Sequence, residues 1–201
     1  MSGAFKKITV AGLLVLLPLC GVWQIGLGAW IHTKAILAQF LLETAWAETL
    51  KGKKEVKPWP WADTWPVSRL TVPRLGISRI VLAGASGSSL AFGPGHLFGT
   101  ALPGTNGNVV IAGHRDTQFR FLQQLKQGDE LLLQANNGKT IQYTITEIRI
   151  SKDTETKYLA DAGVPRLTLI TCYPFDAIRA GGPMRYIVIA TQTTQNQAIP
   201  L

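Results

Sequence analysis

Three residues that could act together in nucleophilic catalysis lie at the ends of apolar, β-like segments. Cys172 ends one segment, His114 closely follows another, and Arg185 begins a third. A thiolate is a strong nucleophile, but an ordinary thiol is only a few per cent ionised at neutral pH. A neighbouring imidazolium or guanidinium favours the thiolate, and a histidine can also protonate a leaving amine. An arginine stays protonated, so it suits stabilisation of an oxyanion or binding of a substrate carbonyl.

The spacing of Cys172 and Arg185 indicates how they could meet. They end and begin successive strand-like segments, with residues 173–184 between them. If these strands pair antiparallel with the two residues opposed, both side chains share a face and their Cα atoms lie about 5 Å apart. In that register Ile170 faces Ile187 and Thr168 faces Ile189. Sequence alone does not fix the register, so this arrangement is a hypothesis.

The elements that would position these residues are short strands. From about Ser68 onward, β-rich runs recur between glycine, proline and asparagine residues. They cover residues 69–72, 79–83, 108–113, 130–135, 140–150, 166–172 and 185–192. ELLLQANNGKTIQYTI predicts a hairpin with Asn137-Gly138 in its turn, and FRFLQQLK predicts a short helix. Many strands without an alternating βαβ pattern predict a single β-barrel or sandwich.

The N-terminal part of the chain has a different character. No charged residue occurs from Ile8 to Ile31. A helix of that length, at about 1.5 Å per residue, crosses an apolar membrane core of about 30 Å. The alternative is a cleaved signal peptide, whose apolar region is normally shorter and ends at small residues. We favour an uncleaved anchor, although lysines flank both ends and charge alone does not decide its orientation.

The segment after the apolar run combines a helical stripe with a linker. Residues 32–50 place apolar side chains at helical spacing, and residues 51–66 are rich in lysine, proline and tryptophan. We therefore divide the chain into an N-terminal segment (1–7), a transmembrane anchor (8–31), an amphipathic helix with linker (32–66) and a β-rich domain (67–201).

Composition excludes several classes of protein. Apolar residues make up 46% of the 201 residues and charged residues 16%, which excludes a disordered chain. The net charge is +8, but the basic residues are scattered, so nucleic-acid binding is not expected. The two cysteines, Cys20 and Cys172, show no spacing typical of a disulfide framework or metal site. Cys172 is therefore predicted to be a free thiol.

Local sequence around the three residues resembles one family. TLITC (Thr168–Cys172) is identical to the TLxTC signature of sortases. GHRDTQF and RYIVIA resemble the segments that hold the family histidine and arginine, and VPRLGISRIVLAGAS also resembles sortase sequence. The resemblance runs from about Leu70 to Thr191 in the family's order. The TCYPF continuation is most similar to class D sortases and to the sortases of Gram-negative bacteria.

This resemblance implies a closed eight-stranded β-barrel with short helices, preceded by a membrane helix. It also implies cleavage of an LPxTG-like sorting signal between Thr and Gly, through a thioacyl-enzyme that an amine resolves. Cys172 would be the nucleophile, His114 the general acid and base, and Arg185 the stabiliser of oxyanion or substrate. Thr171 would help to shape the substrate site.

The partners that the resemblance implies are a secreted protein with a sorting signal and an amine acceptor, in peptidoglycan or another envelope component. The enzyme would be a single-pass protein of the bacterial cytoplasmic (inner) membrane, with its catalytic domain on the extracytoplasmic side. No cofactor is expected. Some sortases bind calcium, but Glu147, Asp153 and Glu155 lack calcium-loop spacing, so no metal is expected either.

Three other functions compete with this hypothesis. A cysteine peptidase or amidase would share the acyl-enzyme and hydrolyse it instead of transferring it. An L,D-transpeptidase would place its cysteine in an SxGC-like setting, which TLITC does not match. A membrane-tethered binding barrel would carry Cys172 as an inert core residue.

Overall fold

The computed structural model describes residues 2–152, 154–160, 163–177, 179 and 181–193. Contacts divide the chain into two units, one ending at Phe40 and the other beginning at Leu41. Helix α1 (Ser2–Leu50) runs through the boundary between them.

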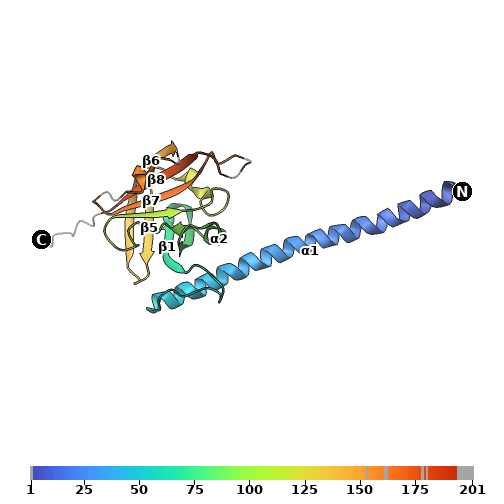
Figure 1. Ribbon diagram of the computed structural model, residues 1–201, viewed down its shortest axis with the longest axis horizontal. Coiled ribbons are helices and arrows are strands. Elements are labelled where there is room, and N and C mark those ends of the chain that lie inside the picture. Colours follow the sequence, from blue (N-terminus) through green and yellow to red (C-terminus); the bar gives the residue numbers. More distant parts are fainter. Residues whose placement is uncertain (1, 153, 161–162, 178, 180, 194–201) are drawn as a thin grey trace. The chain divides into compact units, whose positions relative to one another are not determined.

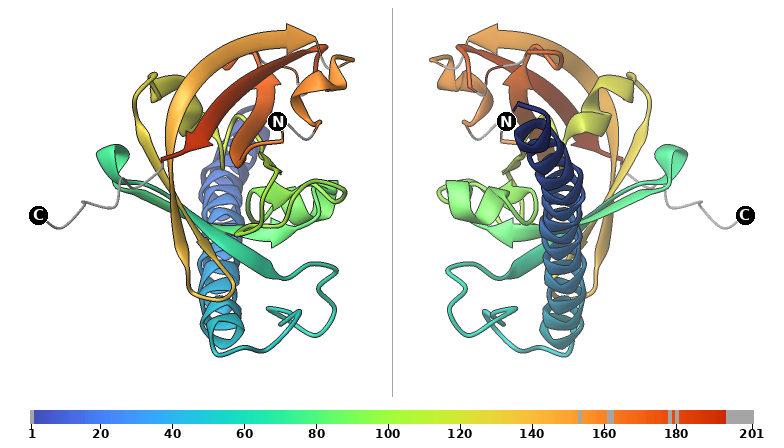
Figure 2. Two further views of the ribbon diagram at one scale, coloured as in Figure 1. Left: turned by 90° about the vertical axis from the view of Figure 1, so that its left-hand side faces the viewer. Right: turned by 90° about the vertical axis from the view of Figure 1, so that its right-hand side faces the viewer.

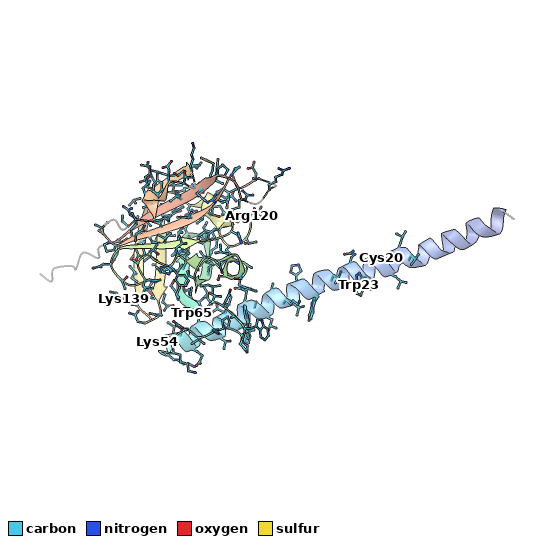
Figure 3. The ribbon with its side chains drawn as sticks, viewed as in Figure 1. Cys20, Trp23, Lys54, Trp65, Arg120 and Lys139 are labelled. Carbon is cyan, nitrogen blue, oxygen red and sulfur yellow. The ribbon has the colours of Figure 1, made fainter. Side chains whose placement is uncertain are left out.

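Helix α1 includes both the predicted anchor, residues 8–31, and the helix expected over 32–50. Pro18 lies inside it without ending it. From Leu16 onward the helix is long and apolar enough to cross a membrane, by length and composition. The large apolar side chains between Leu16 and Trp30 are exposed, and Figure 3 shows Cys20 and Trp23 along this part of the helix. The anchor and the boundaries of the four predicted segments stay predictions.

The second unit is built around a closed β-barrel, in the strand order β1-β2-β3-β4-β7-β8-β6-β5. The long strands β6 and β8 lie side by side and curve around the barrel (Figures 1 and 2). Closure confirms the eight-stranded barrel that the family resemblance implies, and the sandwich alternative is wrong. The strands are β1 (Pro66–Val72), β2 (Ile77–Ala83), β3 (Gly95–His96), β4 (Asn108–Ala112), β5 (Glu130–Ala135), β6 (Thr140–Lys152), β7 (Arg166–Tyr173) and β8 (Met184–Gln192).

Short helical segments connect several of the strands. They are η1 (Pro73–Leu75), α2 (Gly87–Leu90), η2 (Arg120–Gln124) and η3 (Thr156–Tyr158). The helix expected from FRFLQQLK is therefore present only as the short 3-10 helix η2. The other three short helices and the two-residue strand β3 have no counterpart among the elements predicted from sequence.

The hairpin of β5 and β6 follows the prediction. Gln134 pairs with Thr140, and residues 136–139 join the strands. The amide of Gly138 donates to the Ala135 carbonyl at 2.9 Å, and Gly138 has a positive φ of 82°. A glycine adopts this left-handed conformation without a steric penalty, which explains why it ends the turn.

The apolar core fills the inside of the barrel. Strands β1 and β5 alternate buried and half-buried residues, as expected for strands with one face on the core. Strand β2 instead becomes buried on both faces toward its end. The reason is that Leu42 and Trp46, in the last turns of α1, pack against Ile80 and Leu82.

This contact generates a stability prediction. Replacement Trp46→Ala removes a large side chain that is 2% exposed and leaves a cavity beside β2. We expect the free energy of unfolding of the barrel to fall by about 3–5 kcal/mol. Trp61 is 82% exposed, so the matched control Trp61→Ala should change that energy by about 0.5 kcal/mol or less. Urea unfolding of the full chain in detergent measures both, and equal losses would contradict the prediction.

Candidate active site

Cys172 and Arg185 meet as a cross-strand pair. Strands β7 and β8 run antiparallel with Cys172 opposite Arg185. Ile170 lies opposite Ile187 and Thr168 opposite Ile189, so the register predicted from sequence is confirmed. Directly opposed residues in such a ladder have Cα atoms about 4.5–5.5 Å apart.

His114 reaches the same end of the barrel from the other side of β7. Strands β4 and β7 are parallel, with Ala112 matched to Ile170. The amide of Gly113 continues the ladder by donating to the Ile170 carbonyl at 3.1 Å. His114 and Cys172 each lie two residues beyond the matched pair. His114 therefore follows β4 at the same end of the barrel at which β7 carries Cys172, and paired strands lie about 4.8 Å apart.

The alternation of side chains directs Cys172 away from the core. Leu167 and Leu169 are fully buried in the barrel core, and Thr171 is buried on the same face of β7. Ile170 and Cys172 point to the opposite face, where Cys172 is half-buried, and His114 is exposed. Cys172 is a free thiol, as predicted, and so is Cys20. The thiol is thus open to a substrate lying on the outside of the barrel.

The backbone around His114 is held by several contacts. Thr171 Oγ1 donates to the Gly113 carbonyl at 2.7 Å, and the Phe119 amide donates to the His114 carbonyl at 2.9 Å. The ring of the buried Phe119 lies directly over Gly113. A Cβ at Gly113 would come within 2.7 Å of that ring, so only glycine fits before His114.

The guanidinium of Arg185 is held at the start of β8. Its Nη1 donates to the Gly182 carbonyl at 2.6 Å and to the Met184 carbonyl at 3.0 Å. These bonds keep the charged group beside the ends of β7 and β8. An oriented, permanently charged donor of this kind can stabilise a negative charge that develops on a substrate oxygen.

A groove of about 360 Å³ leads along the outer face of these strands. Ala112, Ile170 and Ile187 give it an apolar floor drawn from β4, β7 and β8. Arg185 lies at the groove, and Tyr158 and Leu159 line it from the segment between β6 and β7. The remaining lining residues are Ala85, Leu97, Lys152 and Glu155.

Asn108 fixes the segment that lines this groove. Its Nδ2 donates to the Tyr158 carbonyl at 2.8 Å and to the Ala160 carbonyl at 3.3 Å. Its Oδ1 accepts a bond of 2.7 Å from Thr168 Oγ1. Asn108 and Thr168 are both buried, so the segment after η3 is tied to the outer face of β4 and β7.

Three aromatic rings lie on the other face of the Cys172–Arg185 pair. Tyr173, Phe175 and Tyr186 contact one another with ring centroids 5.1–6.3 Å apart. Phe175 and Tyr186 also pack against the barrel core. Burial, with the nearby Tyr173 as a second cause, raises the pKa of Tyr186. The rings close the core beneath the site.

His96 is separate from this arrangement. It is buried, and its Nε2 lies 2.8 Å from the Ala101 carbonyl and 3.1 Å from Thr100 Oγ1. Burial lowers the pKa of His96, because desolvation disfavours the charged imidazolium. These contacts tie His96, at the end of β3, to the loop that follows this strand.

The described residues contain no group of three His, Cys, Asp or Glu side chains arranged for a metal ion. Glu155 pairs with Lys157 Nζ at 2.8 Å, and Glu147 pairs with Arg149. Asp153, considered as a calcium ligand, lies outside the described residues. The expectation that no metal is needed stays a prediction.

Comparison with known proteins adds the family. Residues 70–193 match the sortase domain family. The chain is 32% identical to Sortase D of Bacillus subtilis (strain 168), over 72% of this chain and 71% of that protein. This agrees with the class D resemblance of the TCYPF segment.

Solved structures share the fold. The Sortase D5 transpeptidase of Clostridium perfringens is 28% identical with a TM-score of 0.58, covering 75% of this chain and 88% of that one. The catalytic domain of B. anthracis SrtD is 38% identical with a TM-score of 0.55, covering 64% of this chain and 87% of that one.

Thr171 gives a prediction about how the site is held. Thr171→Val keeps the side chain's shape but leaves the Gly113 carbonyl without its buried donor. We expect the free energy of unfolding to fall by about 1–3 kcal/mol. We also expect slower alkylation of Cys172 by iodoacetamide at pH 7, because the backbone before His114 is released.

Thr64 provides the control, because it is equally buried and its Oγ1 donates to the Ala83 carbonyl at 2.7 Å. Thr64→Val should lose comparable stability and keep the alkylation rate. If Thr171→Val also kept that rate, the contact would be structural only. A direct role of Thr171 in substrate binding stays a prediction.

Proposed function

Because the chain belongs to the sortase family of cysteine transpeptidases, we propose that it cleaves an LPxTG-like sorting signal and transfers the product to an amine. The substrate would be a secreted protein with this signal near its C-terminus. The acceptor would be an amine of peptidoglycan or of another envelope component. The observation that carries the proposal is the cross-strand pair of Cys172 and Arg185, with His114 just beyond the end of the neighbouring strand and Arg185 lining an apolar groove.

In the first half-reaction Cys172 Sγ, as the thiolate, attacks the carbonyl carbon of the Thr–Gly bond. The electron pair of the carbonyl moves onto its oxygen, and the Arg185 guanidinium stabilises that charge or holds the adjacent substrate backbone. When the intermediate collapses, the C–N bond breaks. His114 supplies the proton that the departing glycine amine needs, which leaves a thioester on Cys172.

The second half-reaction reverses these roles. The acceptor amine attacks the thioester carbonyl, and His114 takes up the proton that the amine loses. The C–S bond then breaks, a new amide forms, and Cys172 is restored. The same intermediate attacked by water would give hydrolysis, which is the alternative function of a cysteine peptidase.

The groove supports an extended peptide substrate. Its apolar floor suits the leucine and proline of an LPxTG-like signal. Lys152 and Glu155 lie at the same groove and are available to polar groups of the peptide. A peptide lying along β7 would bring its scissile carbonyl toward Cys172.

Helix α1 supports a location at the membrane. Sortases act outside the cytoplasm, and the apolar part of α1 is consistent with a membrane anchor or a signal segment. We infer a single-pass anchor in the inner membrane with the barrel on the extracytoplasmic side. Cys20 lies in the apolar part of α1, so Cys172 would be the one thiol of the exposed domain.

The proposal predicts the outcome of an assay with an LPxTG-type peptide and the full chain in detergent. Cys172→Ala should abolish cleavage. His114→Ala should lower kcat by about 100-fold or more. Arg185→Ala should lower it by about 100- to 1,000-fold, as expected for loss of an oxyanion donor. Cys20→Ala should cleave at the wild-type rate, and mass spectrometry follows the products.

Addition of hydroxylamine or triglycine separates the two candidate functions. A transpeptidase forms an amine adduct at the expense of the hydrolysed peptide as the amine concentration rises. If only free acid forms at every amine concentration, the chain acts as a peptidase. If wild type and Cys172→Ala cleave equally, the thiol mechanism is wrong.

Asn108 gives a prediction about the groove. Asn108→Ala releases the carbonyls of Tyr158 and Ala160, so the lining segment is no longer held. We expect KM for the peptide to rise several-fold with little change in kcat, because Cys172, His114 and Arg185 stay in place. The exposed neighbour Asn106 is the control, and Asn106→Ala should leave both constants unchanged. Steady-state kinetics would contradict the prediction if kcat fell and KM did not move.

A further inference from the structure

Arg115, the residue after His114, joins two segments of the site. Its side chain is only 2% exposed. Its Nη2 donates to the Ala177 carbonyl at 2.8 Å and to the Arg179 carbonyl at 2.5 Å. Both carbonyls belong to the loop that leads from Cys172 to Arg185. One guanidinium therefore ties the loop that carries His114 to the loop between the other two residues.

Burial of the charged Arg115 guanidinium costs free energy. Its Nε has Asp116 Oδ1 at 3.3 Å, but the Asp116 side chain is 63% exposed and so compensates the buried charge poorly. Within the described part of the chain, the buried Arg115 Nη1 makes no hydrogen bond. Burying an incompletely paired charge opposes folding, and an apolar side chain of similar size would avoid that cost. What an apolar side chain lacks is the fork of donors that holds two carbonyls.

The joined segments also form the walls of a second groove, of about 660 Å³. The wall on the His114 side consists of Asp116, Arg120 and Gln123. The wall on the Cys172 side consists of residues 173–177. Among the described residues, no strand pairing connects these walls beyond Gly113, so their separation depends on side-chain contacts such as those of Arg115.

We propose that Arg115 is a positioning residue that sets the placement of His114 relative to Cys172 and Arg185. Its catalytic consequence rests on the function proposed above. The proposed role concerns geometry and not charge, because the guanidinium is committed to two carbonyls of the loop. Loss of the two hydrogen bonds from Arg115 should therefore affect the chemical step more than peptide binding in the first groove. Asn108 holds the lining segment of that groove independently of Arg115.

The test uses the full chain in detergent with the Cys20→Ala background, so that Cys172 is the one thiol. Arg115→Met removes the donors at similar volume, and Arg115→Lys keeps the charge without the fork. Arg74→Met is the matched control, because Arg74 also joins two surface segments, through Asp129 and the Gln124 carbonyl. The readouts are alkylation of Cys172 by iodoacetamide at pH 7, kcat and KM for the LPxTG-type peptide, and the midpoint of thermal unfolding.

For Arg115→Met we expect the alkylation rate to fall about tenfold. We expect kcat to fall about 10- to 100-fold with little change in KM, because misplacement of a catalytic group by about 1 Å can lower a reaction rate about 100-fold. Arg115→Lys should recover only part of each rate. Arg74→Met should lower the unfolding midpoint and keep the wild-type rates.

Wild-type alkylation and kcat in Arg115→Met, with only a lower unfolding midpoint, would overturn the proposal. Full recovery in Arg115→Lys would overturn it too, because charge alone would then suffice. Alkylation does not require a sorting signal. If the wild type fails to cleave the peptide, the proposed function fails, and the alkylation rates still decide whether Arg115 positions the site.

Discussion

The site depends on the position of one strand, β7, between two partners of opposite direction. Its antiparallel ladder with β8 sets Cys172 against Arg185, and its parallel ladder with β4 brings His114 to the same level. Neither ladder alone assembles the three residues. Barrel closure requires both at once, because β7 has no free edge along the paired residues. Backbone hydrogen bonds therefore bring these three residues to one end of the barrel.

The apolar core protects that register. Leu167 and Leu169 alternate with Thr168 and Ile170 along β7, and only the leucines belong to the barrel core. A slip of one residue would turn the leucines outward and Cys172 inward, because side chains in a strand alternate between faces. The burial that stabilises the barrel thus also keeps the thiol on the outer, accessible face. The stability of the barrel and the accessibility of the Cys172 thiol therefore depend on the same alternation of side chains along β7.

The sequence predicted those elements correctly that depend on the order of neighbouring residues. Alternation, turn residues and apolar runs were enough for seven of the strands and for the hairpin of β5 and β6. The opposition of Cys172 and Arg185 followed from assuming that the two residues meet across successive strands. Sequence failed for β3, since two residues are too short for any period to appear. The anchor and the helix expected to emerge from the bilayer both lie in α1, because good helix formers allow it to continue.

The contacts that hold the loops were not predictable in the same way. Arg115 reaches Ala177 and Asn108 reaches Tyr158, pairs separated by 62 and 50 residues. No periodicity links such residues, and isolated polar side chains after a strand are usually solvated. Strand register fixes the ends of β4, β7 and β8, but the loops beyond those ends have no ladder to place them. Buried side-chain donors to loop carbonyls hold these loops instead, so the least predictable contacts lie in the loops that flank the candidate site.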